Sequence, residues 1–265
     1  MDNFTDLEET LFVPMLGRIH ATENFPNILN DRVALGLKSK LPNNIKGAKT
    51  QTEYTLLAGA VRSSNMDRYI QDFLSRNSNG IIVLLGAGLE TTFFRNDNGK
   101  NKFFEVDFPE VINYREKLLG NHDRDILVKG DALKEDWLEF IRKDYPDNPM
   151  LVVCSGVLYY FKVSQVELMC SNIKKYGNAE LVFDIVNSTG LKLMGHYMKQ
   201  VGHGDVDTYF YVDNSEEFAS KVSGTLIKEE AYYRYTPKKG LKLSTKTTMF
   251  FSDRLRTVKM VHVKF

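Results

Sequence analysis

The stretch Ile81-Ile82-Val83-Leu84-Leu85-Gly86-Ala87-Gly88 joins an apolar run to a turn that contains two glycines. A short apolar run without polar alternation is typical of a strand buried on both faces, as in a parallel sheet covered by helices. Glycines directly after such a strand let the backbone turn tightly and approach a ligand closely. This stretch therefore predicts the first strand of an open α/β sheet.

Four further apolar runs follow at intervals that leave room for helices, and they predict more strands of the same sheet. Helical periodicity covers Thr55–Arg76, ahead of the first strand. A second helix is expected from Pro109, a favoured first helical residue, to Gly120, a favoured residue just beyond a helix end. A third is expected where Ser164 and Glu167 have the spacing of a capping box. The four runs are Lys102–Asp107, Asp125–Lys129, Met150–Cys154 and Leu181–Ile185.

The C-terminal part of the chain departs from this alternation. After the fifth strand, helical patterns are expected near Leu191–Val201 and Asn214–Val222. Two runs rich in aromatic and β-branched residues, Thr225–Tyr235 and Thr257–Phe265, are typical of strands. We expect these two runs to form an antiparallel hairpin at the edge of the sheet.

The N-terminal part lacks the regularly spaced apolar runs that predict strands elsewhere in the sequence. Residues 4–53 contain three prolines, so we expect short helices packed over the ligand-binding edge of the sheet. No repeat or Pro/Ser-rich linker divides the sequence. We therefore interpret residues 1–265 as one domain, with a helical cap at 1–53 and a lid-like insertion at 187–224.

The composition excludes several classes of protein. With 35 Lys and Arg against 34 Asp and Glu, the formal charge of +1 gives no overall field to attract nucleic acid. The charge-free run Asn148–Phe161 is shorter than a membrane span requires, and the acidic N-terminus is unlike a secretory signal. The two cysteines and five histidines show no metal-ligand spacing. We expect a cytoplasmic protein that binds no nucleic acid, membrane or metal; the sequence leaves its oligomeric state open.

Candidate ligand-binding residues stand where the predicted strands end. In an open α/β sheet, ligands bind beyond the carboxyl ends of the strands. Gly86 and Gly88 follow the first strand, and Asp107 ends the second, nineteen residues after Gly88. That separation suits a carboxylate that accepts hydrogen bonds from the two ribose hydroxyls of an adenosine cofactor. Asp131 follows the third strand, where it could accept from the adenine amine, although Asp also favours turns and helix starts.

The glycine turn also bears on which adenosine cofactor is bound. Dinucleotide enzymes normally carry a third glycine three residues after the second, and Thr91 occupies that position here. This substitution favours S-adenosylmethionine, which has no pyrophosphate, over NAD. An NAD-dependent oxidoreductase remains an alternative.

Several of these motifs, in this order, resemble the leucine carboxyl methyltransferase family. They are Val61-Arg62-Ser63 with Asp67, Leu85 to Thr91, Phe94-Arg95, Phe104-Glu105-Val106-Asp107-Phe108-Pro109-Glu110-Val111, Gly130-Asp131, and Ser155-Gly156-Val157-Leu158-Tyr159-Tyr160. The resemblance covers roughly residues 10–190. The segments Thr10–Pro14 and Ile28–Asp31 are closer to the bacterial, tetracenomycin-type polyketide O-methyltransferase branch than to the eukaryotic phosphatase methylases.

The resemblance implies a class I S-adenosylmethionine-dependent methyltransferase fold, Rossmann-like and mostly parallel, with methyl transfer to an oxygen atom. It assigns Arg62 to the methionine carboxylate of the cofactor, with Arg18 as an approximate match to a second basic position. It assigns Tyr160 to the neighbourhood of the methyl donor. The full cofactor-binding set that we expect is Arg18, Arg62, Gly86, Ala87, Gly88, Asp107, Phe108, Asp131, Ala132, Leu133, Ser155 and Gly156.

Two residues depart from the family pattern. Ser155 stands where members commonly carry Glu, and a hydroxyl can hydrogen-bond the cofactor ammonium without neutralising its charge. Glu90 replaces the usual Asp of the glycine turn. The first departure motivates another alternative, a protein that binds S-adenosylmethionine without catalysis.

The expected reaction is methyl transfer to a carboxylate or phenolic oxygen of a small molecule, with polyketide-like acceptors among the candidates. A carboxylate is ionised at pH 7 and needs no base, whereas a phenol would be helped by one. His196 and His203, in the segment expected to cover the substrate, are candidate bases; both could equally be surface histidines.

Overall fold

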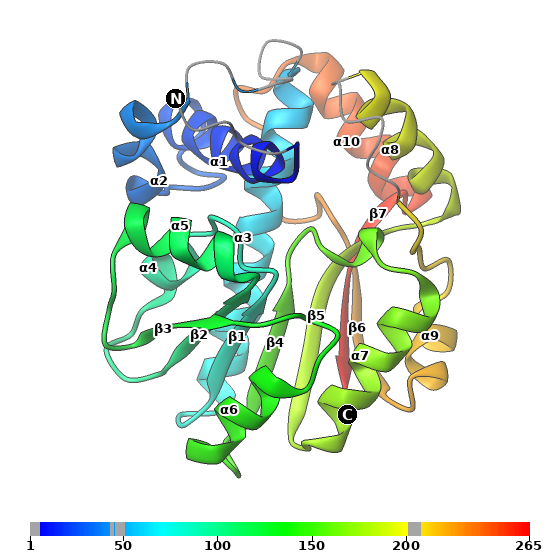
Figure 1. The fold of residues 1–265 in the computed structure, drawn as a ribbon. Coiled ribbons are helices and arrows are strands. Elements are labelled where there is room, and N and C mark those ends of the chain that lie inside the picture. The colour runs from blue at the N-terminus through cyan, green and yellow to red at the C-terminus, as the bar shows by residue number, and fades with distance from the viewer. Residues whose placement is uncertain (1–5, 43–44, 46–50, 201–207) are drawn as a thin grey trace.

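In the computed structural model, seven strands form one mixed sheet in the order β3-β2-β1-β4-β5-β7-β6 (Figure 1). The first five strands in sequence are parallel to one another, and β7 is antiparallel to both β5 and β6. The chain therefore folds as the expected α/β methyltransferase type, with an antiparallel C-terminal edge. The strands are β1 (Ile81–Leu85), β2 (Phe103–Asp107), β3 (Asp125–Lys129), β4 (Met150–Cys154), β5 (Ala179–Val186), β6 (Thr225–Ala231) and β7 (Val258–Lys264).

The structure describes residues 6–42, 45, 51–200 and 208–265. None of the helices in these ranges is long and apolar enough to cross a membrane. The α-helices are α1 (Asp6–Asn24), α2 (Arg32–Gly36), α3 (Glu53–Arg76), α4 (Thr92–Asn96), α5 (Pro109–Leu119), α6 (Asp136–Asp144), α7 (Val163–Lys175), α8 (Ser188–Gln200), α9 (Ser215–Lys221) and α10 (Leu243–Leu255). Short 3-10 helices cover Lys38–Lys40 and Leu158–Tyr160.

The sheet is buried between two helical layers, because alternate residues of its central strands point into opposite cores. On one face, Ile82 and Leu84 of β1 join a cluster with residues of α3, α4 and α10. On the other face, Val83 and Leu85 join a cluster with residues of α6, α7 and α9. Burial on both faces explains why these strands are continuous apolar runs in the sequence.

The predicted strands and most predicted helices are confirmed. The second strand begins one residue later than predicted, and the fifth begins two residues earlier and ends one later. The sixth ends at Ala231, four residues before the predicted end, and the seventh is one residue shorter at each end. The predicted capping box at Ser164 is wrong: the helix begins at Val163, and the Gln165 side chain accepts a hydrogen bond from the Lys162 N–H (2.8 Å).

The predicted C-terminal hairpin is also wrong. β6 and β7 do pair antiparallel, but α10 lies between them in sequence, so they are not joined by a turn. The sequence of α10 is rich in Thr, a residue with low helix propensity, which explains why the sequence pattern does not predict this helix. β7 lies between β5 and β6 in the sheet, which makes β6 the edge strand.

The N-terminal helices lie across the carboxyl ends of the strands (Figure 1). α1 is one long helix that continues through Pro14, not the series of short helices that was expected. It packs directly on α3, where a Cβ on Gly17 would overlap the carbonyl oxygen of Leu56. A glycine at this point therefore permits the close approach of the two helices.

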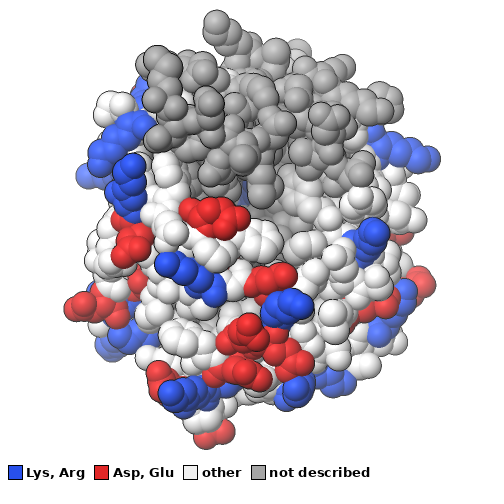
Figure 2. Space-filling view, viewed as in Figure 1, with Lys and Arg blue, Asp and Glu red and all other residues white. Residues whose placement is uncertain are grey.

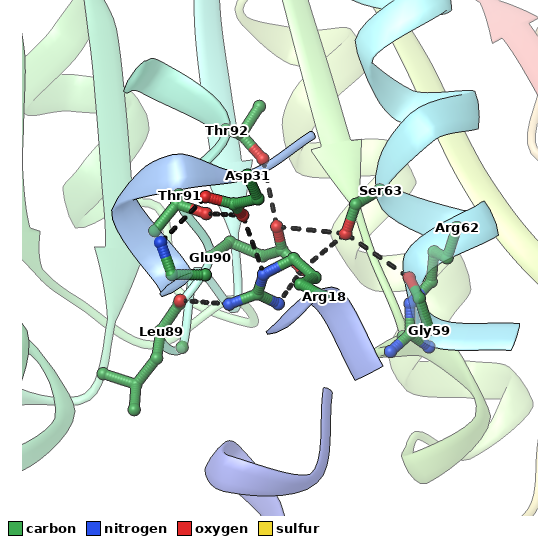
Figure 3. Close-up of polar contacts among 12 residues, drawn as sticks. Arg18, Asp31, Gly59, Arg62, Ser63, Leu89, Glu90, Thr91 and Thr92 are labelled. Carbon is green, nitrogen blue, oxygen red and sulfur yellow. Dashed lines mark hydrogen bonds and ion pairs between the residues drawn. The ribbon is translucent and has the colours of Figure 1, made fainter. Parts of the chain in front are cut away.

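A buried network of ion pairs joins this N-terminal segment to the turn after β1 (Figure 3). Nη1 of Arg18 on α1 donates to Glu90 Oε1 at 2.7 Å, and Arg18 Nε lies 3.2 Å from Asp31 Oδ2. Arg95 of α4 donates to the same Asp31 oxygen at 2.8 Å and to Asp67 Oδ2 of α3 at 2.7 Å. All five side chains are buried or nearly so, so each charge depends on its partners.

The surface agrees with the charge balance of the sequence. On the described part of the face in Figure 2, acidic and basic side chains are interspersed. This part of the face therefore presents no continuous basic surface of the kind that binds a polyanion.

We predict that Glu90→Gln lowers the free energy of unfolding by about 3 kcal/mol at pH 7, because it removes one of the carboxylates that compensate the buried Arg18 and Arg95. Burial raises the pKa of Glu90, but Arg18 and Arg95 outweigh it and hold the pKa at about 2, below the ordinary 4.5. The stabilisation is therefore present above pH 4.5 and is lost as the pH falls toward 2. Denaturant titrations at pH 7 and pH 3 would measure it.

The matched control is Glu23→Gln, which removes an exposed pair with Lys38 (2.6 Å) and should cost less than about 1 kcal/mol. Equal losses in the two variants, or a Glu90→Gln effect that is the same at both pH values, would contradict the prediction.

Candidate functional site

The turn after β1 and the end of β2 form one hydrogen-bonded unit. Gly86 (φ +71°) and Gly88 (φ +49°) adopt the left-handed backbone conformation that favours glycine. Asp107 Oδ2 accepts from the Gly88 N–H and Asp107 Oδ1 from the Phe108 N–H, both at 2.8 Å. Burial raises the pKa of Asp107 above 3.8, although these two hydrogen bonds act against that rise. The sequence-predicted Gly88 and Asp107 are thus in direct contact.

The end of β3 presents Asp131 in a turn. Its Oδ1 accepts from the Leu133 N–H at 2.9 Å, the local hydrogen bond that Asp commonly makes in turns. β3 lies beside β2, and Asp107 and Lys129 are register partners at the ends of the two strands. Asp131, Ala132 and Leu133 therefore follow the strand next to that of Asp107, as expected.

A second polar cluster lies at the ends of β4 and β5. Nη1 of Arg62 on α3 donates to Tyr159 OH at 2.9 Å, and Tyr159 OH donates to Asp184 Oδ2 at 2.6 Å. Arg62 Nη1 itself lies 3.5 Å from that Asp184 oxygen. The Gly156 N–H donates to the other oxygen, Asp184 Oδ1, at 2.7 Å. We call Arg62, Tyr159 and Asp184 the inner polar cluster.

Gly156 is required by this cluster. It has φ +75°, and a Cβ there would overlap the Arg62 guanidinium. Next to it, the buried Ser155 Oγ has no hydrogen-bond partner within the described residues, and neither does Arg62 Nε. Buried polar atoms normally have partners, so a ligand at this end of the sheet would account for both of these unsatisfied atoms.

Asp184 was missed by the sequence analysis. It is a carboxylate within the otherwise apolar strand segment Leu181–Val186, and its side chain is buried. A lone acid in such a run needs a cation or hydrogen-bond donors, and that signal could have identified it.

The remaining predicted residues lie in different surroundings. Arg18 is fully buried in the ion-pair network and also donates to the carbonyl oxygen of Leu89 at 2.6 Å (Figure 3). Tyr160 is half-exposed, with its ring 5.5 Å from that of Tyr159. His196 belongs to α8, but its side chain lies outside the described part of the structure, as does all of His203.

A cavity of about 640 Å³ opens beside the inner polar cluster. It is bounded by α1, α3, α8 and α10, and most of its described lining is apolar or aromatic. Its described lining includes the inner polar cluster and Tyr160 but not Gly86, Gly88, Asp107 or Asp131. Of the predicted cofactor-binding residues, Arg62 alone is among those that line the described cavity, and Tyr160, predicted near the methyl donor, lines it as well.

Comparison with known proteins places this chain in a family. A model of the leucine carboxyl methyltransferase family matches residues 19–174. The tetracenomycin polyketide synthesis O-methyltransferase TcmP of Streptomyces glaucescens is 22% identical over 228 residues, covering 85% of this chain and 83% of TcmP.

Two solved structures have a similar fold. A Thermobifida fusca protein described as a methyltransferase has a TM-score of 0.60 at 13% identity, over 94% of each chain. Magnesium protoporphyrin IX methyltransferase (ChlM) from Synechocystis PCC 6803, solved with bound S-adenosylhomocysteine, has a TM-score of 0.52 at 9% identity, over 97% of this chain and 99% of ChlM. At these identities the likeness concerns the fold alone.

The family match extends over more than half of the chain and includes the glycine turn, Asp107 and Gly156. This protein therefore belongs to the leucine carboxyl methyltransferase family and is an S-adenosylmethionine-dependent methyltransferase.

Proposed function

We propose that this protein transfers the methyl group of S-adenosylmethionine to a carboxylate oxygen of a small-molecule acceptor. The observation that carries the proposal is that the inner polar cluster, which contains the predicted cofactor residue Arg62, lines a largely apolar cavity. The acceptor of the relative TcmP belongs to polyketide synthesis, which makes polyketide-like acids reasonable candidates here.

The residues present fit the cofactor. Arg62 would hold the methionine carboxylate, since its Nε is buried without a partner. Ser155 Oγ, also without a partner, would accept a hydrogen bond from the cofactor ammonium. Asp107 would hold the ribose hydroxyls, and the turn at Gly86 and Gly88 would let the backbone approach the cofactor. Asp131 and Ala132 would contact the adenine.

When bound, S-adenosylmethionine supplies an electrophilic methyl group. The chain has to hold the acceptor oxygen in line with it and exclude water. The apolar walls of the cavity would exclude water, and Tyr160 would line the reaction site. Segments 1–53 and 187–224 are proposed to cover the acceptor. A carboxylate has a pKa near 4 and is already ionised at pH 7, so this reaction needs no general base.

A phenolic acceptor is the second possibility within the same reaction class. Its pKa near 10 would require a base within hydrogen-bond reach. Asp184 lines the cavity but already accepts hydrogen bonds from Tyr159 and Gly156. His196 and His203 therefore remain the candidate bases for that acceptor.

The two alternatives from other classes are separated by ligand binding. A ligand that binds the native state raises the melting temperature. Stabilisation by S-adenosylhomocysteine but not by NADH would eliminate the oxidoreductase. Binding of S-adenosylhomocysteine without transfer of tritiated methyl groups to any acid or phenol would support the non-catalytic protein.

We predict that Asp107→Asn raises the dissociation constant of S-adenosylhomocysteine at least about tenfold, because an amide accepts fewer hydrogen bonds from a diol and carries no charge. Since the pKa of Asp107 is raised above 3.8, wild-type affinity should fall as the pH is lowered toward that raised value. The variant should lack this dependence. Isothermal titration calorimetry across pH measures both effects.

The control for that experiment is Asp97→Asn, which removes an exposed pair with Arg124 (2.6 Å) and should leave the dissociation constant unchanged. An Asp107→Asn variant that binds as tightly as wild type would refute the assignment.

We further predict that His196→Ala and His203→Ala each leave turnover of a carboxylic acid within about twofold at saturating S-adenosylmethionine. On a phenol, loss of the true base should slow turnover about 100-fold. Turnover assays with one acid and one phenol of similar shape test both statements. A large loss on the acid would contradict the proposed base-free reaction.

A further inference from the structure

Two buried arginines hold the backbone of the turn that follows β1. Arg115 of α5 donates from Nη1 to the carbonyl oxygens of Gly88 (3.2 Å) and Glu90 (2.5 Å). Arg18 of α1 donates from Nη2 to the carbonyl oxygen between them, that of Leu89, at 2.6 Å (Figure 3). Three consecutive carbonyl groups of the turn are therefore bound by charged donors, which form stronger hydrogen bonds than neutral ones.

These hydrogen bonds fix the direction in which the turn presents its N–H groups. A peptide unit is planar and trans, so its carbonyl and its N–H point in opposite directions. Each carbonyl that is bound to an arginine therefore sets the direction of the next N–H along the chain. In the same turn the Gly88 N–H donates to Asp107 Oδ2 at 2.8 Å. The backbone that Arg115 holds is thus also the backbone that orients the carboxylate assigned to the ribose.

Arg115 is itself held by the sheet beneath it. Its Nη2 lies 2.8 Å from Glu105 Oε1 of β2 and 3.8 Å from Asp125 Oδ2 of β3. Arg115 and Glu105 are fully buried, and Asp125 is nearly so. A buried arginine requires such partners, and here they keep its guanidinium in one place behind the turn.

The charge of Arg115 also acts on Asp107. Burial raises the pKa of Asp107, and the N–H groups of Gly88 and Phe108 act against that rise. The positive charge of Arg115 likewise lowers this pKa, whereas the carboxylate of Glu110, also on α5, raises it. Arg115 therefore favours the ionised form of Asp107, in which both oxygens only accept hydrogen bonds, as binding to a diol requires.

We propose that Arg115 is a positioning residue for the cofactor, which fixes the turn after β1 in its ligand-binding conformation and acts on the ribose through Asp107. The inference rests on the proposed cofactor role of this turn and of Asp107, and it does not depend on the acceptor. A site whose first contacts are held by a second layer of side chains needs less ordering when the ligand binds. Loss of Arg115 should therefore weaken cofactor binding without removing any group that touches the cofactor.

The test compares two buried arginines that hold backbone carbonyls at opposite ends of the sheet. Arg142 of α6 is 8% exposed and donates to carbonyl oxygens in the segments that precede β4 and β5, among them those of Tyr145 (3.1 Å), Asn148 (2.6 Å) and Gly177 (2.6 Å). Arg142→Met is therefore the matched control for Arg115→Met. Both substitutions should lower the melting temperature, because both leave buried carbonyl groups without their donor.

The two variants should differ in binding. We expect Arg115→Met to raise the dissociation constant of S-adenosylhomocysteine at least about tenfold at pH 7. The pH below which affinity falls should also be higher in Arg115→Met than in wild type, because removal of the cation raises the pKa of Asp107. Arg142→Met should change neither quantity. Isothermal titration calorimetry across pH, with the full-length proteins below their melting temperatures, measures both.

Arg115→Lys separates the geometry of the guanidinium from its charge. A lysine keeps a positive charge beside Glu105 but offers one nitrogen in place of the planar fork, so it cannot reproduce the full set of contacts. We expect a dissociation constant raised about threefold or more, with the pH dependence of wild type. Arg142→Lys is the control. Should the methionine variants not fold, the two lysine variants decide the question by the same comparison.

The outcomes separate this inference from the proposed function. If S-adenosylhomocysteine does not bind wild type, both fail. If it binds, but the Arg115 variants bind it no more weakly than the Arg142 variants, the inference fails while the proposed methyl transfer stands. A folded Arg115→Met whose pH dependence matches wild type would also overturn it, because a purely structural role predicts that result. Weakened binding confined to the Arg115 variants, with the pH shift wherever Arg115→Met folds, would establish it.

Discussion

The buried carboxylate of Asp184 is the constraint on which the arrangement of the site depends. It stands in an apolar strand that is covered on both faces, where an unpaired charge would be unstable. Three donors compensate it: the Gly156 N–H, Tyr159 OH and Arg62. Because these donors come from the segment after β4, which includes the 3-10 helix, and from α3, one carboxylate joins two segments that are distant in sequence at the carboxyl end of the sheet.

A similar principle holds the N-terminal segment in place. Asp31 forms an ion pair with Arg18 and accepts a hydrogen bond from Arg95, so α1 and α4 are joined through one carboxylate beside the turn after β1. Buried pairs contribute to stability only where nearly every charge has a partner, and here Glu90 and Asp67 complete the set. The helix that bounds the cavity at Pro14 is thus fixed to the same turn that contains the predicted cofactor residues Gly86 and Gly88.

Local patterns in the sequence were sufficient for the strands and for the positions at their ends, because burial on both faces leaves continuous apolar runs. The Thr-rich sequence of α10 has no such clear signature, so two strands that pair in the sheet were wrongly joined as a hairpin. Contacts between residues that are distant in sequence also could not be predicted from local patterns. Arg18 and Glu90 are 72 positions apart, and nothing local to Arg18 distinguishes a buried network from a ligand site.

Electrostatic compensation determines which charged side chains the cavity can contain. Arg62 and Asp184 must both be present for the apolar cavity to contain either of them, since each would be costly to bury alone. For the proposed carboxylate acceptor no base is needed, so the chemistry would demand little of the side chains around the oxygen. Discrimination among acceptors would then fall to the walls of the cavity, most of which are apolar or aromatic.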